Sequence, residues 1–222
     1  MWCIAEITPE YRQRMYLLLD LYEEEYNPNY PVICIDEKIK QLIEEKRTPI
    51  PMKPGRPAKY DYEYKRNGTR NIFVAVEPKG GRRIITVTKT RKKNDFANFV
   101  REVVENKYEQ ATEIRIVLDN LNTHFEKSFY ETFTKKEAKR ILRKITFCYT
   151  PKHGSWLNMA EIEINVMDRE CLGEKTGNEK LLKQQIKSWV KERNKLKKKI
   201  LWKFTKQDAD KKLSKHYAPK LN

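Results

Sequence analysis

Two aspartates each close a short apolar run. Asp36 ends the run 31–36 (PVICID), and Asp119 ends the run 114–119 (IRIVLD). Continuous apolar runs of this length are typical of strands buried in the middle of a sheet, and α/β sheets bind ligands at the carboxyl ends of their strands. If the two strands are neighbours, the carboxylates repel each other unless a cation lies between them, and oxygen ligands of this kind favour Mg²⁺ or Mn²⁺. The alternative is that each aspartate only begins the turn after its strand.

A helix predicted from about Leu157 to Cys171 offers a third carboxylate for such a site. At about 100° per residue, Glu161 and Glu163 lie on opposite flanks of its apolar stripe, and Asp168 lies on the same side as Glu161. Each of the three also fits a solvated helix flank. Helical periodicity alone therefore does not choose among them.

The elements that would position these residues alternate along the chain. An amphipathic helix is predicted over 8–26 with Thr8 as its N-cap, and the proline-rich stretch 47–68 is predicted to be irregular. A hairpin is predicted from the β-rich runs 71–76 and 82–88 around a turn at 78–81. Further helices are predicted at about 94–107, 126–142 and 178–199, with a strand at 145–149. This order predicts a mixed α/β sheet with helices packed on it.

The charge of the chain points to a polyanion. A formal net charge of +16 on 222 residues is typical of proteins that bind nucleic acid. The excess is uneven, since residues 172–222 hold sixteen basic residues against five acidic ones. The sequence contains no apolar run that could span a membrane and no signal-peptide pattern. Four scattered cysteines without a Cys-x-x-Cys pair argue against a zinc finger and fit reduced thiols in the cytoplasm.

Several sequence blocks resemble one enzyme family. Residues 34–38 (CIDEK), 117–120 (VLDN) followed by Thr123 and His124, and 149–161 (YTPKHGSWLNMAE) resemble the three catalytic blocks of DDE transposases, specifically the mariner-like group of bacterial insertion sequences. Residues 60–73 (YDYEYKRNGTRNIF) resemble the segment of that group between its first aspartate and the hairpin. The resemblance extends over roughly residues 1–200 in the order of the family.

The resemblance implies a ribonuclease-H-like fold, with an antiparallel hairpin, parallel strands and helices on both faces of the sheet. It implies two divalent ions, Mg²⁺ or Mn²⁺, held by Asp36, Asp119 and Glu161. Glu161 is favoured because residues 157–160 (LNMA) match the pattern before the last carboxylate of the family, and Glu163 is the reserve candidate. In the implied reaction the ions activate water or a DNA 3′-hydroxyl and stabilise the leaving oxygen, so that one site cleaves and joins DNA strands.

Other residues are predicted to support this chemistry. His124, Asn120 and Asn158 are candidates for orienting the site; His124 could instead contact a phosphate or make only a local hydrogen bond. Basic residues near the motifs and in the C-terminal region are predicted to bind DNA phosphates. The predicted DNA-binding residues are Lys38, Arg82, Arg83, Arg91, Lys92, Lys93, Lys152, His153, Lys197, Lys198 and Lys199. No role is assigned to His216 or to the cysteines.

We expect three regions: a helical lead-in at 1–30, the catalytic domain at 31–172 and a basic helical extension at 173–222. Relatives carry a helix-turn-helix domain that binds the transposon ends. No such region precedes Asp36 here, so we expect end recognition to reside on a separate subunit or to be missing. We expect DNA ends and target DNA as partners, a homodimer in the active complex, and a nucleoid-associated protein in the cytoplasm of a bacterium or archaeon. Two alternatives are a catalytically idle DNA-binding subunit and a related nuclease acting on RNA hybrids or branched DNA.

Overall fold

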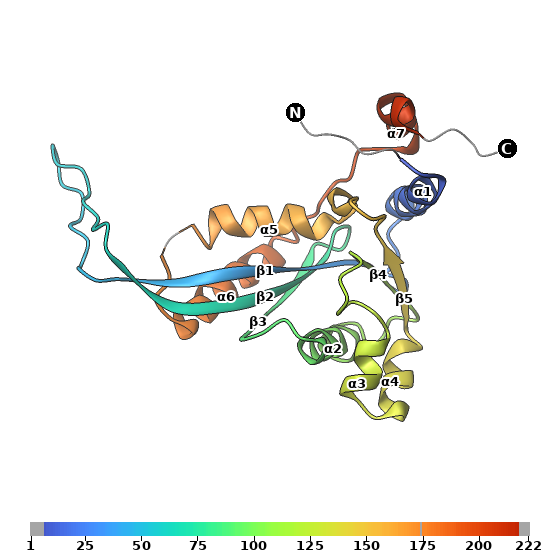
Figure 1. Ribbon diagram of the computed structural model, residues 1–222, viewed down its shortest axis with the longest axis horizontal. Helices are drawn as coiled ribbons and strands as arrows, with labels where there is room; N and C mark the ends of the chain where they lie inside the picture. Colours follow the sequence, from blue (N-terminus) through green and yellow to red (C-terminus); the bar gives the residue numbers. More distant parts are fainter. Residues whose placement is uncertain (1–6, 174, 218–222) are drawn as a thin grey trace.

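The computed structural model describes residues 7–173 and 175–217, which fold around one mixed sheet (Figure 1). Its five strands lie in the order β3-β2-β1-β4-β5. The hairpin pairings β1–β2 and β2–β3 are antiparallel, whereas β1–β4 and β4–β5 are parallel, which confirms the predicted mixed sheet. The strands are β1 (Val32–Glu45), β2 (Tyr64–Glu77), β3 (Arg82–Thr88), β4 (Ile114–Leu118) and β5 (Ile145–Tyr149).

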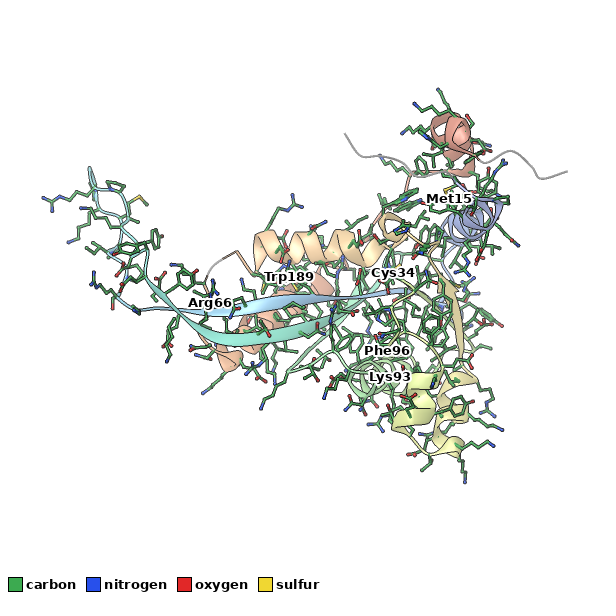
Figure 2. All side chains as sticks on the ribbon, in the orientation of Figure 1. Met15, Cys34, Arg66, Lys93, Phe96 and Trp189 are labelled. Carbon is green, nitrogen blue, oxygen red and sulfur yellow. The ribbon has the colours of Figure 1, made fainter. Side chains whose placement is uncertain are left out.

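Helices cover both faces of the sheet. On one face, Ile35 and Phe73 pack against Phe96 and Phe99 of α2, and α3 and α4 lie beside them. The other face carries α1, α5 and α6. The helices are α1 (Pro9–Glu23), α2 (Lys93–Glu102) with a following π turn (Val103–Lys107), α3 (Lys127–Thr132), α4 (Lys135–Leu142), α5 (Met159–Glu170), α6 (Glu179–Lys195) and α7 (Lys206–Leu213). Figure 2 shows Phe96 and Trp189 on opposite sides of the sheet.

The alternation of side chains along β1 assigns each residue to a face. Cys34 packs with residues of α1 and with Ala160 of α5, and Leu42 packs with Met167 of α5 and with α6. Asp36 falls between them in the same alternation and therefore lies on the α5 side. Ile35 and Glu37 lie on the α2 side.

Three predictions of secondary structure were wrong in detail. The strand predicted to end at Asp36 continues to Glu45, so that Asp36 lies within β1 and not at its end. Residues 64–68 were predicted to be irregular but belong to β2, which pairs with the far half of β1 in a long arm that projects from the body (Figure 1). Because residues 64–66 and 68 are exposed, this part of the sequence lacks the alternation that reveals a half-buried strand. The helix predicted over 126–142 is two helices, since Thr134 and Glu137 form a capping box that starts α4 anew.

The hairpin turn between β2 and β3 requires a glycine. Gly81 has a φ of +71°, and a Cβ there would lie 2.6 Å from the carbonyl oxygen of Lys197. The predicted turn at 78–81 is confirmed, and it brings the segment after α6 against the hairpin. Within the described ranges, none of the helices combines the length and the apolar character needed to cross a membrane.

Candidate active site

The two aspartates lie on neighbouring strands. β1 and β4 pair in parallel, with Cys34 opposite Val117, so that two residues further on Asp36 is level with Asp119. Cys34 and Val117, each two residues before one of the aspartates, are buried on the side of the sheet that faces α1 and α5. The arrangement that brings two carboxylates together at one sheet edge is therefore present.

The environment of Asp36 is acidic as well as partly buried. Burial raises the pKa of Asp36 to about 7, although its Oδ1 accepts a 2.8 Å hydrogen bond from the Glu37 N–H that opposes this shift. The negative charges of Glu37, Asp119 and Glu161 contribute to this raised pKa of Asp36. The carboxylates of Glu37, Asp119 and Glu161, which come from three separate parts of the fold, are thus close enough to raise the pKa of Asp36.

A buried histidine holds Asp119. The Oδ1 atom of Asp119 accepts hydrogen bonds from the Leu121 N–H at 3.0 Å and from Nδ1 of His124 at 2.7 Å. The other ring nitrogen of His124 lies 3.1 Å from Oε2 of Glu37. Burial acts to lower the pKa of His124, but its hydrogen bonds to Asp119 and Glu37 outweigh burial and raise the pKa to about 9. The ring is therefore an imidazolium at neutral pH and donates to both carboxylates.

His124 is enclosed by the protein. Its side chain is 0% exposed, and its ring lies 4.6 Å from the ring of Phe96. A DNA phosphate has no access to a side chain with this burial, so the geometry favours the orienting role among the predicted roles of His124. Burial acts to raise the pKa of Asp119, but the hydrogen bonds from His124 and Leu121 outweigh it and lower the pKa. Asp119 is therefore held as a carboxylate.

Two asparagines tie the strand ends to the surrounding loops. Asn158 is buried; its amide donates to the Ile35 carbonyl at 2.8 Å, and its Oδ1 accepts from the Ala160 N–H at 3.1 Å. This cap begins α5 directly beside β1, and Glu161 lies in the first turn, three residues after Asn158. Asn120 donates to the Thr150 carbonyl at 2.7 Å and thereby links the segment after β4 to that after β5.

Helical periodicity did not choose among Glu161, Glu163 and Asp168 of α5, but these three carboxylates have different surroundings. Glu163 is 1% exposed, and its two oxygens accept from Arg83 at 2.8 and 2.9 Å and from Arg193 at 2.7 and 3.3 Å. Asp168 forms an ion pair with Lys38 at 2.6 Å. Glu161 is half-buried and has no ion-pair partner among the residues that the structure describes. The reserve assignment of Glu163 as a metal ligand is therefore contradicted, because its oxygens neutralise two arginines.

The arrangement suits a divalent cation in charge and donor type but does not form a closed cage. Asp36, Asp119 and Glu161 supply carboxylate oxygens. The pKa of Asp36 is raised by burial first and also by the neighbouring negative charges, which a cation would neutralise. Within residues 7–173 and 175–217, however, no three Asp, Glu, His or Cys side chains are gathered tightly enough to hold an ion together. Binding would require side-chain movement toward a shared centre.

The predicted DNA-binding residues fall into two groups. Arg83 is 2% exposed and committed to Glu163, so its predicted contact with DNA was wrong: a cluster of basic residues in sequence does not reveal which one turns inward. Lys38 and Lys93 are engaged in ion pairs with Asp168 and Glu131. The remaining members are exposed: Arg82, Arg91, Lys92, Lys152, His153, Lys197, Lys198 and Lys199.

Arg91 and Glu37 have specific relations to the site. The positive charge of Arg91 contributes to the lowered pKa of Asp119, which places this exposed arginine near the carboxylates. Glu37 was not among the predicted site residues, although its side chain is 4% exposed and binds His124. Glu37 lies on the opposite face of β1 from Asp36, and only the fold shows that His124 contacts both Glu37 and Asp119.

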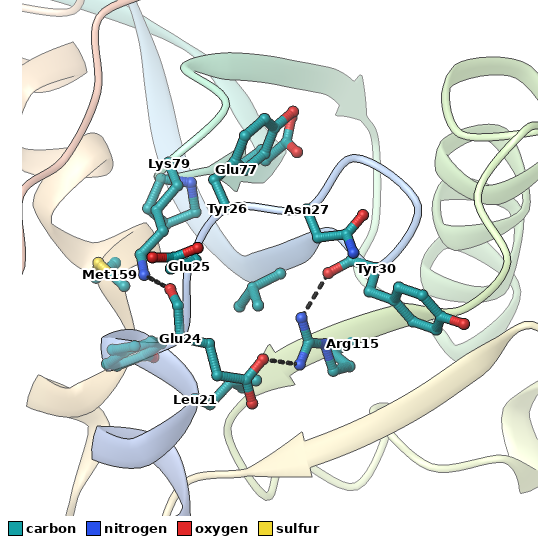
Figure 3. Close-up of a pocket in the computed structure, with 13 residues that line it drawn as sticks. Leu21, Glu24, Glu25, Tyr26, Asn27, Tyr30, Glu77, Lys79, Arg115 and Met159 are labelled. Atoms are coloured by element: carbon teal, nitrogen blue, oxygen red, sulfur yellow. Dashed lines mark hydrogen bonds and ion pairs between the residues drawn. The ribbon is translucent and has the colours of Figure 1, made fainter.

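A separate small cavity lies at the other end of the strands (Figure 3). It is lined by the end of α1, by Glu77 and by Arg115, which pairs with Glu24 and donates to the Tyr30 carbonyl at 2.6 Å. Its free volume is about 20 Å³, roughly the room of one water molecule. Since it adjoins the amino ends of β1 and β4, it is distinct from the carboxylate site.

Solved structures share this architecture. The Mos1 mariner paired-end complex with Mn matches with a TM-score of 0.58 at 14% identity, over 89% of this chain and 60% of that chain. The Mos1 paired-end complex with Mg matches with a TM-score of 0.55 at 16% identity, over 99% and 66%. The Mos1 strand transfer complex matches with a TM-score of 0.54 at 13% identity, over 86% and 57%. These matches confirm the ribonuclease-H-like fold, and the chain spans about 60% of the length of the first of these structures.

A protein-family model also matches the sequence. No curated protein sequence matches the chain. The model described as DDE superfamily endonuclease matches residues 31–183, a range that contains Asp36, Asp119 and all of α5. With that match over most of its length, the chain belongs to the DDE superfamily of endonucleases.

Proposed function

We propose that this chain is the catalytic domain of a transposase, which cuts DNA strands at transposon ends and joins them to target DNA. The observation that carries the proposal is the convergence of Asp36, Asp119 and Glu161 from β1, β4 and α5, inside the region matched by the endonuclease family. The similar structures are paired-end and strand transfer complexes of Mos1. We accordingly propose DNA ends and target DNA as substrates and two copies of the chain in the active complex.

In this proposal Asp36, Asp119 and Glu161 hold two divalent ions, Mg²⁺ or Mn²⁺. Ions bound there would supply an activated oxygen nucleophile and stabilisation of the leaving oxygen. The chain itself contributes the orientation of the carboxylates: His124 holds Asp119 by one oxygen and leaves Oδ2 without a hydrogen bond from the described residues. Asn158 sets the start of the helix that presents Glu161. Arg91 lies where it could attract a DNA phosphate toward the acidic centre.

We also propose the regional division inferred from the sequence, with a lead-in at 1–30, a catalytic domain at 31–172 and a basic extension at 173–222. Part of the support is that α6 contacts β3, so the extension packs on the sheet. The exposed lysines at 197–199 follow α6 directly and are proposed to lie along DNA.

The test is strand cleavage with supercoiled plasmid and with duplexes carrying transposon ends, in Mg²⁺ or Mn²⁺. We expect product from the wild type and at least a 100-fold loss with Asp119→Asn, since electrostatic groups of this importance typically contribute about 10²–10³ in rate. Asp168→Asn is the matched control, because this residue lies on the same helix as Glu161 but pairs with Lys38. Equal product from the wild type and Asp119→Asn would refute the assignment.

A catalytically idle DNA-binding subunit is the second candidate, and one observation favours it: the carboxylates do not form a closed cage in the described structure. Metal binding separates the two functions. A ligand at 100 times its Kd stabilises a protein by about 2.7 kcal/mol, which corresponds to a rise in Tm of roughly 5–10 °C for a chain of this size. We expect Mn²⁺ to produce a rise that Asp36→Ala abolishes; an idle subunit would show no such rise.

A further inference from the structure

The longest helix of the chain presents a row of lysines to solvent. Lysines recur along α6 at steps of three or four residues, and all of them are exposed. At about 100° per residue they cover one face roughly 120° wide. Leu182, Ile186 and Arg193 lie on the opposite side, where the helix contacts the sheet and α5. We call this row the α6 lysine face; it consists of Lys180, Lys183, Lys187, Lys191 and Lys195.

The charges of the α6 lysine face are largely uncompensated. Lys183 pairs with Glu179 at 2.7 Å, and it is the only one of the five with an ion pair to a residue that the structure describes. Lys183, Lys187, Lys191 and Lys195 instead stand four residues apart, a spacing at which like charges destabilise a helix. A helix face that only needs to be solvated usually alternates the signs of its charges. The one-signed face therefore indicates an anionic partner with many charges in a row.

The helix that carries this face is held firmly in place. The Asn178 side chain caps it by accepting from the Leu181 N–H at 2.9 Å. Near its end, Asn194 exchanges two hydrogen bonds with the backbone of Arg83 in β3, at 2.7 and 2.9 Å. Arg193 joins Glu163 of α5. Little conformational freedom of the backbone is thus left to lose when the lysines meet a partner.

The α6 lysine face also lies apart from the carboxylates. α6 contacts the sheet mainly at β3, and β3 lies two strands from β1, the strand of Asp36, a separation of about 9–10 Å before side chains are counted. Figure 1 shows α6 beside β2 and β3, with β4 and β5 at the other end of the sheet. From Lys180 to Lys195 the face is about 22 Å long, a length over which duplex DNA carries about 13 phosphate charges.

We infer that the α6 lysine face binds the phosphate backbone of duplex DNA at a stretch other than the one being cut. This inference deepens the proposed function, on which it rests for the identity of the polyanion. Each phosphate contact contributes about 0.9 to the slope of log K against log salt concentration. Five lysines could therefore account for a slope of about −4.5 from this face alone.

The test compares two triple variants in DNA binding, measured by fluorescence anisotropy without divalent metal at 50 to 200 mM salt. The first variant carries Lys187→Gln, Lys191→Gln and Lys195→Gln. The matched control carries Lys135→Gln, Lys136→Gln and Lys139→Gln, which removes the same charge from exposed lysines of α4. We expect the α6 variant to lower the salt slope by about 2.7, so that the wild type loses about 40-fold more affinity across this range than the variant. The control should keep a slope close to that of the wild type.

Further measurements keep the result interpretable. Far-UV circular dichroism verifies that α6 remains helical, since glutamine and lysine have similar helix propensity. A variant with arginine at 187, 191 and 195 should restore the slope, because it restores the charge. Equal slopes for the two glutamine triples would overturn the inference, as would equally tight binding to phosphatidylserine vesicles, which would make the face a membrane-binding surface. Because no cleavage is required, failure of the proposed catalytic function leaves this measurement unaffected.

Discussion

Exchanging Glu161 or Glu163 of α5 for glutamine should separate stability from catalysis. Glu161 and Glu163 are two residues apart on one helix, but only Glu163 is enclosed, with both oxygens on Arg83 and Arg193. Glu163→Gln removes the negative charge and leaves the Arg83 guanidinium, 0% exposed, facing a neutral amide. Glu161→Gln removes a half-buried carboxylate from an already acidic cluster.

The two variants are expected to change different quantities: Glu163→Gln the stability of the fold, and Glu161→Gln the rate of strand cleavage. Breaking a buried ion pair by removing one partner typically costs about 3–5 kcal/mol, because the remaining charge is uncompensated. For a chain of this size that corresponds to a fall in Tm of roughly 6–20 °C. Glu161→Gln relieves repulsion on Asp36 and should leave Tm unchanged or slightly higher. Under the proposed function it should nevertheless reduce strand cleavage by at least about 100-fold.

The assays are urea denaturation and thermal unfolding without divalent metal, together with cleavage at a temperature well below the Tm of both variants. We expect Glu163→Gln to be destabilised but active while folded, and Glu161→Gln to be stable but inactive. The opposite pattern, with an active Glu161→Gln and a stable, inactive Glu163→Gln, would refute both the structural role of Glu163 and the catalytic assignment of Glu161.

Three further predictions concern the frame of the site. The pKa of His124 is raised from 6.5 to about 9. Its contribution of about 3 kcal/mol to the free energy of unfolding is therefore present below pH 6.5 and lost as the pH rises through 9. Stability measured in EDTA should fall over this window, and His124→Gln should flatten the fall. Asn158→Ala should cost at least about 1 kcal/mol in urea denaturation, because it removes the α5 cap and the donor to the Ile35 carbonyl; an unchanged midpoint would contradict the capping role. Gly81→Ala should cost about 1–3 kcal/mol, because φ is +71° and the added Cβ meets the Lys197 carbonyl; Gly55→Ala, with a similar φ and open space, should cost less in the same assay.

The sequence predicted the buried parts of the strands and the aspartates that follow them because these depend on local pattern, although β1 continues past Asp36 to Glu45 and β2 begins at Tyr64. An apolar run followed by Asp36 or Asp119 is visible within a few residues, and the fold places the two strands side by side. The identity of the third carboxylate was not visible in the helical pattern of α5. What distinguishes Glu163 from Glu161 is Arg83 on β3 and Arg193 on α6, both far away in the sequence.

The same limitation explains the two remaining discrepancies. Arg82 and Arg83 are adjacent basic residues, yet strand alternation turns Arg83 inward to Glu163 and leaves Arg82 in solvent. Glu37, to which the sequence analysis gave no role, forms a buried contact with His124. Local charge and hydropathy describe what a residue is suited to, whereas its partner is decided by packing between distant elements.

The carboxylate of Glu163 couples α5 mechanically to α6. Arg193 of α6 and Arg83 of β3 hold this side chain from two directions, and Glu161 lies only about 3 Å along the axis of the same helix. A tilt of α6 against the sheet must therefore either separate a buried charge pair or carry α5, and with it Glu161, in the same direction. A force applied by DNA to the outer side of α6 would be transmitted to the position of the third carboxylate.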